Sequence, residues 1–165
     1  MIMNHPRATV TLPNDTQIQI TRTFDAPPEL VFKAWTTPEY VRRWWGSAEA
    51  PLVVCDIDLS VGGSWRYVSR DASGTELGWH GTCLELDPPL RMVSTEVFEG
   101  FPDAEAVNTL VLSADGDRTL MTVTVQHSSR ENRDGHLNSG MEAGMQVVLE
   151  RLDDVLEGLK IVSAP

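Results

Sequence analysis

The chain has 165 residues, a hydrophobic fraction of 41%, five Trp and a formal net charge of −11. This length allows one domain with a hydrophobic core of its own, and the acidic balance excludes the basic surfaces with which proteins bind nucleic acids. There is no apolar run long enough to cross a bilayer, and residues 1–15 lack the apolar core of a signal peptide, so we expect a cytoplasmic protein without membrane insertion.

The two cysteines do not indicate a metal site. Cys55 and Cys83 show no CxxC spacing, and no histidines at zinc-ligand spacing accompany them. We expect reduced thiols in the core, and we predict neither a metal nor a cofactor.

The first part of the chain predicts a tail or weak edge strand, then a regular strand and two short helices. Residues 1–16 are polar and contain prolines, which indicates a loose tail or a weak edge strand. Residues 17–24 alternate in the two-residue period of a strand. Asp25 and Thr37 each precede a helix start that contains proline, so we expect them to cap two short helices, of which the second ends near Trp44.

Six further strands are predicted, separated by turns rich in Gly, Asp and Pro. The pair Pro88-Pro89 belongs in a connection, because prolines cannot donate ladder hydrogen bonds. Asp115-Gly116-Asp117 is typical of a hairpin turn. We expect the strands at residues 51–59, 65–68, 77–86, 90–98, 106–113 and 118–127.

The C-terminal part predicts a long amphipathic helix over residues 134–159, started by a capping pattern at residues 128–131. Gly135 and Gly140 predict a break or bend before its long straight part. The apolar stripe consists of Leu137, Met141, Met145, Val148, Leu152, Leu156 and Leu159. The opposite side carries Glu142, Gln146, Glu150, Asp153 and Glu157.

These elements predict an α+β helix-grip fold in a single domain over residues 17–161. A strongly curved antiparallel sheet of about six to seven strands wraps around the long C-terminal helix, and two short helices follow the first strand. Wrapping a curved sheet about a helix commonly leaves an apolar hollow between them, and such hollows hold ligands.

Four strings carry a resemblance to a known family. They are ITRTFDAPPELVFKAWTTPEYVRRWWG at 20–46, DLSVGGSWRYV at 58–68, the run 81–89 leading into RMVSTEVFEG, and RDGHLNSGMEAGMQVVLERLDDVL at 133–156. Together they resemble the SRPBCC superfamily of START-like and birch-pollen-allergen-like proteins. Within it, the chain is similar to bacterial members of the family named after the heat-shock-protein-90 ATPase activator, and the likeness covers nearly everything after residue 17.

The resemblance implies a cavity for a small apolar or amphipathic molecule. Members of the superfamily include cyclases, ligand carriers, stress-related proteins and chaperone activators, so membership predicts the fold far better than the function. Ser47, Ser60 and His80 depart from the family pattern, which usually has a proline, an arginine and an apolar residue at these positions.

Trp44 and Trp45 end the second short helix near the expected mouth of the cavity. A pair of indoles can line a ligand entrance or bind a partner protein. Alternatively, one Trp packs into the core and the other covers a loop.

Met121, Met141 and Met145 are suited to an adaptable cavity wall, because methionine is unbranched and polarizable. Ordinary core filling explains them equally well. Gly140 and Gly144 either leave space in the middle of the helix or let a strand or a second subunit approach closely.

His80, Glu96 and His127 are titratable residues within predicted strands. If two of them point inward, a buried carboxylate beside an imidazole could act as general base and acid; otherwise each is a solvent-facing or satisfied strand residue. Trp65 and Tyr67 share one strand face and can each supply a polar handle. We see no nucleophile elbow and no H-E-x-x-H string, and we assign no catalytic residue.

Three functions are open from the sequence. The first is binding of a small hydrophobic molecule between sheet and helix. The second is an enzyme of the polyketide-cyclase or dehydratase type, in which Glu96, His80 or Tyr67 moves protons. The third is a chaperone-regulating interaction module, suggested only by the family name. A homodimer could form through a sheet edge or through the region of Trp44 and Trp45.

Overall fold

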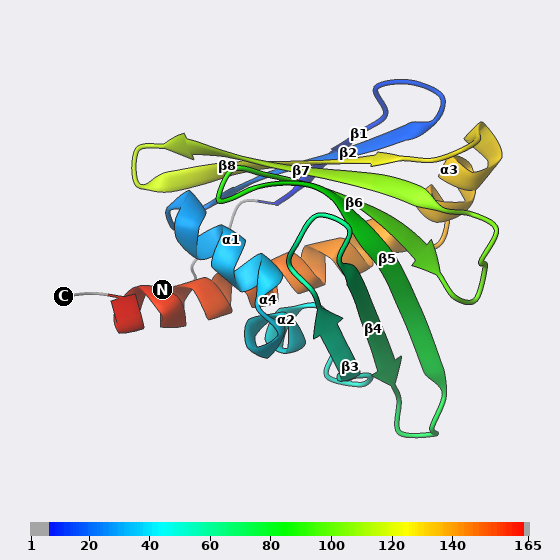
Figure 1. Cartoon of the computed structure of the whole chain (residues 1–165), viewed down its shortest axis with the longest axis horizontal. Coiled ribbons are helices and arrows are strands. Elements are labelled where there is room, and N and C mark those ends of the chain that lie inside the picture. Colours follow the sequence, from blue (N-terminus) through cyan, green and yellow to red (C-terminus); the bar gives the residue numbers. More distant parts are fainter. Residues whose placement is uncertain (1–6, 164–165) are drawn as a thin grey trace.

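The computed structural model describes residues 7–163, in which eight strands and four helices follow one another (Figure 1). The strands are β1 (Thr9–Thr11), β2 (Gln17–Phe24), β3 (Leu52–Ile57), β4 (Ser64–Arg70), β5 (Glu76–Asp87), β6 (Arg91–Phe98), β7 (Ala106–Asp115) and β8 (Arg118–Gln126). The helices are α1 (Pro28–Thr36), α2 (Pro38–Trp44), α3 (Arg130–Leu137) and α4 (Met141–Ser163). Within the described residues, no helix is both long and apolar enough to cross a membrane.

All eight strands form one antiparallel sheet in the order β1-β2-β8-β7-β6-β5-β4-β3. The sheet is strongly bent: β2, β8 and β7 run across the top of Figure 1, β5, β4 and β3 turn downward, and α4 lies along the inner side. The predicted α+β helix-grip fold is confirmed. The strand beyond the expected number is β1, which pairs with β2; residues 1–6 of the predicted tail lie outside the described residues.

The inner side of the sheet and α4 enclose the main hydrophobic core. The buried apolar residues of α4 are Leu149, Leu152, Val155, Leu156 and Leu159. Burying a leucine or valine side chain stabilises the fold by about 1.5–3 kcal/mol relative to leaving it exposed. The predicted stripe is thus buried in the second half of the helix, whereas Leu137, Met141 and Met145 are only half-buried against the core.

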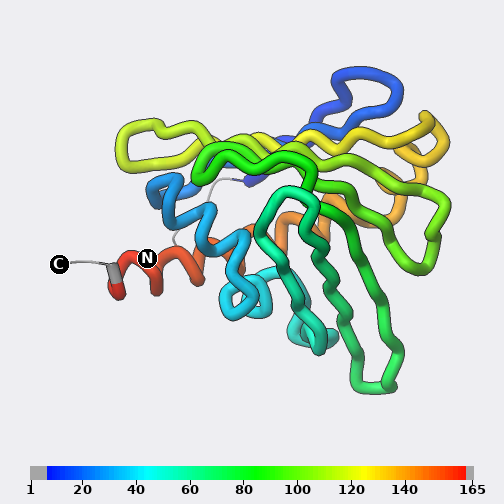
Figure 2. The backbone as a smooth tube through the Cα atoms, in the orientation of Figure 1, coloured from blue at the N-terminus to red at the C-terminus, as the bar shows by residue number. Residues whose placement is uncertain are grey.

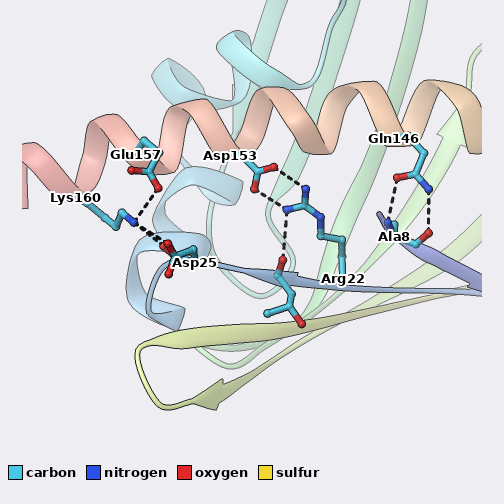
Figure 3. A network of polar contacts seen from close by, with 8 residues as sticks. Ala8, Arg22, Asp25, Gln146, Asp153, Glu157 and Lys160 are labelled. Carbon is cyan, nitrogen blue, oxygen red and sulfur yellow. Dashed lines mark hydrogen bonds and ion pairs between the residues drawn. The ribbon is translucent and has the colours of Figure 1, made fainter. Parts of the chain in front are cut away.

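Two polar residues of α4 are buried, although the helical period placed them on the polar side. The Gln146 amide accepts a hydrogen bond from the Ala8 backbone nitrogen at 3.0 Å and donates one to the Ala8 oxygen at 2.9 Å. Asp153 accepts two hydrogen bonds from the Arg22 guanidinium of β2, at 2.5 and 2.6 Å (Figure 3). The alternation of β2 places Arg22 on its apolar side, and Asp153 is the partner that compensates its charge there.

The predicted break before the long straight helix lies at residues 138–140, between α3 and α4. Gly140 has a φ of +85°, in the left-handed region that side chains other than glycine rarely adopt. Ser129 caps α3 by accepting a hydrogen bond from the Asn132 backbone nitrogen at 3.0 Å. The turn between the helices leads the chain back beneath the sheet, at the end of the molecule far from the last turn of α4 (Figure 2).

The expected caps of the two short helices differ from those observed. The N-cap of α1 is Pro27, and the Asp25 carboxylate instead pairs with Lys160 of α4 at 3.5 Å. Thr37 is the N-cap of α2, as expected, but its side chain makes no capping hydrogen bond. Proline at the start of each helix already removes one of the backbone donors that a cap would satisfy.

Side chains from helices reach both edges of the sheet. At one edge, β1 is only three residues long, and the preceding Ala8 is bound by Gln146 of α4. At the other edge, Arg42 of α2 donates a hydrogen bond to the Leu52 carbonyl oxygen of β3 at 3.2 Å. The edge strands are therefore tied to the helices that cover the inner side of the sheet.

Candidate functional site

Two cavities are hollowed into the inner side of the sheet. The larger one has a volume of about 620 Å³ and lies between strands β5–β8 and helix α3. Most of its wall is apolar, and the polar side chains come mainly from α3 and from His127, which follows β8. Its lining residues are Leu77, Trp79, Glu96, Phe98, Phe101, Ala104, Ala106, Val125, His127, Glu131, Asn132, Gly135, His136 and Ser139.

The smaller cavity has a volume of about 140 Å³ and lies beside the C-terminal end of α2. It is lined by Trp35, Thr36, Trp44, Trp45, Ile57, Asp58, Leu59, Gly63, Trp65, Tyr67, Cys83, Met92, Ser94, Glu96 and Asn108.

Glu96 on β6 lines both cavities. Its Oε2 accepts a hydrogen bond from Asn108 Nδ2 on the neighbouring strand at 2.7 Å. Burial raises the pKa of Glu96, because the ionised carboxylate loses its hydration; the hydrogen bond from Asn108 acts in the opposite direction and is the smaller effect. Within the described part of the chain, Oε1 of Glu96 accepts no hydrogen bond. One oxygen of this half-buried carboxyl group is therefore available to a molecule in the cavity.

Glu96, Ala106 and His127 form a row across three strands and all line the larger cavity. Glu96 pairs with Ala106, and the adjoining pair of Val107 with Gln126 brings His127 next to Ala106. Because neighbouring strands lie about 4.8 Å apart, the carboxyl and imidazole groups are anchored roughly 10 Å apart, with only a methyl group between them. The small middle residue leaves space that two polar side chains flank.

His127 and His136 connect the end of β8 to α3. Nε2 of His127 lies 3.0 Å from Nδ1 of His136, so one ring donates a hydrogen bond to the other. Burial lowers the pKa of His127 to about 4, with further contributions from His136 and Arg133, and burial also lowers the pKa of His136. Nδ1 of His127 is buried and has no hydrogen-bond partner among the described residues. Both rings are therefore neutral near pH 7.

Five aromatic side chains form a continuous aromatic wall from the smaller cavity to the larger one: Trp65, Tyr67, Trp45, Trp79 and Phe98. In this order, successive ring centroids are 4.8, 5.1, 4.6 and 5.5 Å apart. Contacts between aromatic rings stabilise the fold by more than the burial of their apolar area alone. Burial also raises the pKa of the Tyr67 hydroxyl, with smaller contributions from Cys55 and Glu96, so the group stays protonated.

The two tryptophans at the end of α2 have different surroundings. Trp44 is buried in the core, its Nε1 donates a hydrogen bond to the Ala34 carbonyl oxygen at 3.0 Å, and its ring packs against Trp35 at 4.8 Å. Trp45 belongs to the aromatic wall. The structure thus combines the two alternatives: one indole is a core residue, and both line the smaller cavity.

His80 lines neither cavity, because it lies on the outer face of the sheet. It pairs with Arg66 across β4 and β5, whereas the neighbouring pair of Tyr67 with Trp79 points inward. Nδ1 of His80 lies 2.8 Å from Glu99 Oε2, and Arg66 donates two further hydrogen bonds to the same carboxylate. Arg66 and His80 together lower the pKa of Glu99 to about 2. This cluster is an exposed ion-pair group on the far side of the sheet.

The three candidate methionines also lie away from the two cavities. Met121 is fully buried in the main core, and Met141 and Met145 are half-buried against it. Among the described residues, ordinary core filling accounts for all three.

Several lining residues were not singled out from the sequence. Asn108 carries a recognisable signal, since it is a polar residue on the side of β7 that otherwise buries Ala106, Leu110 and Leu112. The sequence signal for Trp79 is weaker. His136 has no such signal, because its position depends on the break between α3 and α4. Among residues 7–163, no three His, Cys, Asp or Glu side chains are grouped to hold a metal ion.

Glu96→Gln should raise the stability of the protein at neutral pH and leave it unchanged near pH 4. The pKa of Glu96 is raised on folding from its ordinary value of 4.5, so wild-type stability is lost as the pH rises from about 4.5 through the folded-state value. Above this pH range, the free energy of unfolding of Glu96→Gln should exceed that of wild type by about 1.4 kcal/mol for each unit by which the pKa is raised. Urea unfolding between pH 4 and 8 measures it.

Glu85→Gln is the matched control, because Glu85 is exposed and pairs with Arg91 on the surface. Its effect should stay within about 0.5 kcal/mol. A Glu96→Gln protein that is less stable than wild type at pH 8 would contradict a Glu96 pKa raised by burial.

Comparison with known proteins agrees with this architecture. The sequence profile of the family described as "Activator of Hsp90 ATPase homolog 1-like protein" matches residues 25–157. No curated protein matches the chain.

Several solved structures are similar to this one. A protein from Rhodobacter sphaeroides is 25% identical with a TM-score of 0.89, covering 93% of this chain and 99% of that one. A solution structure from Arthrobacter aurescens is 25% identical with a TM-score of 0.80, covering 91% of each chain. CalU16 from Micromonospora echinospora is 25% identical with a TM-score of 0.61, covering 88% of this chain and 80% of that one.

Proposed function

This chain belongs to the family of Activator of Hsp90 ATPase homolog 1-like proteins, and from that premise we propose that it binds a small hydrophobic or amphipathic molecule in the larger cavity. The observation that carries the proposal is the volume of about 620 Å³ within a mainly apolar wall. Cavities of roughly 300–1,000 Å³ with a few polar groups are typical of small-molecule sites. Here the polar groups are Glu96 on one side and His127 with His136 on the other.

The ligand would bind with its apolar body against Trp79, Phe98 and Val125. Its polar group would lie near Oε1 of Glu96, which accepts no hydrogen bond from the described residues. Buried polar groups without partners are costly, and a ligand that satisfies them would gain affinity.

Ala104→Trp should block the larger cavity. Ala104 lines it from the loop between β6 and β7 and is only partly buried, so an indole can replace the ligand without disturbing the main core. Titration with the neutral fluorescent probe Nile red should show an affinity loss of about tenfold or more, equivalent to about 1.4 kcal/mol or more.

Ala72→Trp is the matched control, because it adds the same side chain to an exposed turn between β4 and β5. It should bind the probe like wild type. Equal probe affinity in the Ala104→Trp protein, or no binding by wild type, would contradict the proposed site.

A second candidate function is a proton-transfer enzyme of the cyclase or dehydratase type. The observation in its favour is the inward row, in which a carboxyl group with a raised pKa and a neutral imidazole flank the same space. If the protein is such an enzyme, wild type should carry the product and the variants the substrate. The molecule that copurifies with wild-type protein should then differ in mass from the one that copurifies with Glu96→Gln or His127→Gln. The same molecule in all three would leave binding as the function. The chaperone contact suggested by the family description stays a prediction.

A further inference from the structure

Within residues 7–163, carboxyl side chains line the two cavities, and basic ones of the Lys or Arg type do not. Asp58 lines the smaller cavity, Glu131 lines the larger one, and Glu96 lines both. No Lys or Arg is among the described residues of either wall, and the pKa of both lining histidines is lowered. A ligand carboxylate or phosphate would therefore lose its hydration without meeting an opposite charge.

The surroundings of Glu96 suit a cation. The aromatic wall passes beside it: Glu96 lines the smaller cavity together with Trp65 and Tyr67, and the larger cavity together with Trp79 and Phe98. Trp65 donates its indole N–H to the Thr95 carbonyl oxygen at 3.1 Å, so its ring face is what remains for a ligand. The faces of aromatic rings carry the negative part of the ring quadrupole and attract cations.

The net charge of the whole molecule also favours cationic ligands. A formal net charge of −11 produces a field that attracts cations toward the protein and repels anions. Ligand selection thus follows from three independent features: the acidic lining, the aromatic wall and the overall charge.

We infer that the ligand class is a hydrophobic amine, whose apolar body occupies the larger cavity and whose ammonium group pairs with Oε1 of Glu96 beside the aromatic wall. This inference rests on the proposed function and names the ligand class of the same site. An ammonium group in this position donates a charge-assisted hydrogen bond and makes a cation–π contact, two interactions that an alcohol of the same shape lacks.

Isothermal titration of the full chain with three matched probes tests the inference: 1-naphthylmethylamine, 1-naphthylmethanol and 1-naphthoate. They share one ring system and differ in the charge of the polar group. At pH 7, the amine should bind about tenfold or more tightly than the alcohol, and the naphthoate should bind most weakly. Because the bound ammonium favours the ionised form of Glu96, the affinity for the amine should increase as the pH rises from about 4.5 through the folded-state pKa of Glu96.

Glu96→Gln should lower the affinity for the amine about tenfold and leave that for the alcohol within about threefold. The amide keeps an oxygen that can accept the Asn108 hydrogen bond. Glu85→Gln should bind all three probes like wild type, because Glu85 lines neither cavity.

The outcomes separate this inference from the proposed function. Equal binding of amine and alcohol, tightest binding of naphthoate, or unchanged amine affinity in Glu96→Gln would overturn the amine class and leave the cavity as a ligand site. Absence of binding by all three probes would contradict the proposed function and the amine class together.

Discussion

Asp153→Leu lowers the free energy of unfolding by about 3–5 kcal/mol, the cost of removing one partner of a buried ion pair. The side chains of Arg22 and Asp153 are 2% and 8% exposed and are joined by two short hydrogen bonds (Figure 3). Removing the carboxylate takes two short hydrogen bonds from the Arg22 guanidinium, which stays inside the interface of β2 and α4. Urea unfolding at pH 7 measures the loss.

Asp154→Asn is the matched control, since Asp154 is the next residue of α4 and is exposed; its effect should stay within about 0.5 kcal/mol. The double variant Arg22→Met with Asp153→Leu should regain most of the lost stability, because an apolar pair of similar volume avoids the desolvation of both charges. A single Asp153→Leu protein as stable as wild type would show that the charge of Arg22 is compensated by other groups.

Gly81→Ala lowers the free energy of unfolding by about 1–3 kcal/mol through steric overlap. A Cβ atom at this position of β5 would overlap the Thr95 carbonyl oxygen and lie 2.6 Å from Nε1 of Trp65. The Trp65 indole crosses Gly81 to donate its hydrogen bond to Thr95 on β6, so the overlap cannot be relieved without moving the aromatic wall. Unfolding curves give the loss, and near-ultraviolet circular dichroism reports the rearranged tryptophans.

Gly144→Ala provides the opposite control. Gly144 lies in α4, and a Cβ atom there would meet nothing within 4 Å, so the substitution should stabilise the protein by about 0.5–1 kcal/mol. If Gly81→Ala behaved like Gly144→Ala, the close approach of Trp65 to β5 would be wrong.

The fold was predictable because each element carries a local signal. Alternation identifies the strands, proline marks the starts of α1 and α2, and Gly140 marks the break before α4. The buried side of α4 was less predictable, because a helical period places Gln146 and Asp153 on the polar side. Partners more than 130 residues away, Ala8 and Arg22, bind them in the interior. Such pairs depend on tertiary packing rather than on the local pattern.

The candidate site was predictable only in part. Alternation shows that Trp65 and Tyr67 share a face of β4, but it does not show how β5 is aligned against that strand. The observed register opposes His80 to Arg66 on the outer face, whereas Glu96 and His127 both point inward. The larger cavity also depends on where α3 meets the sheet, which follows from the geometry of the break at residues 138–140 and has no counterpart in the residue pattern.

The two tethered edges bear on how this protein avoids aggregation. An open sheet offers unpaired backbone groups at its outer strands, which can template pairing with another chain. Here one outer strand has only three residues and is preceded by Ala8, whose backbone groups are both bound by Gln146. The other has its Leu52 carbonyl oxygen occupied by Arg42. Two helix side chains thus act as substitutes for missing neighbouring strands and disfavour intermolecular β-sheet extension.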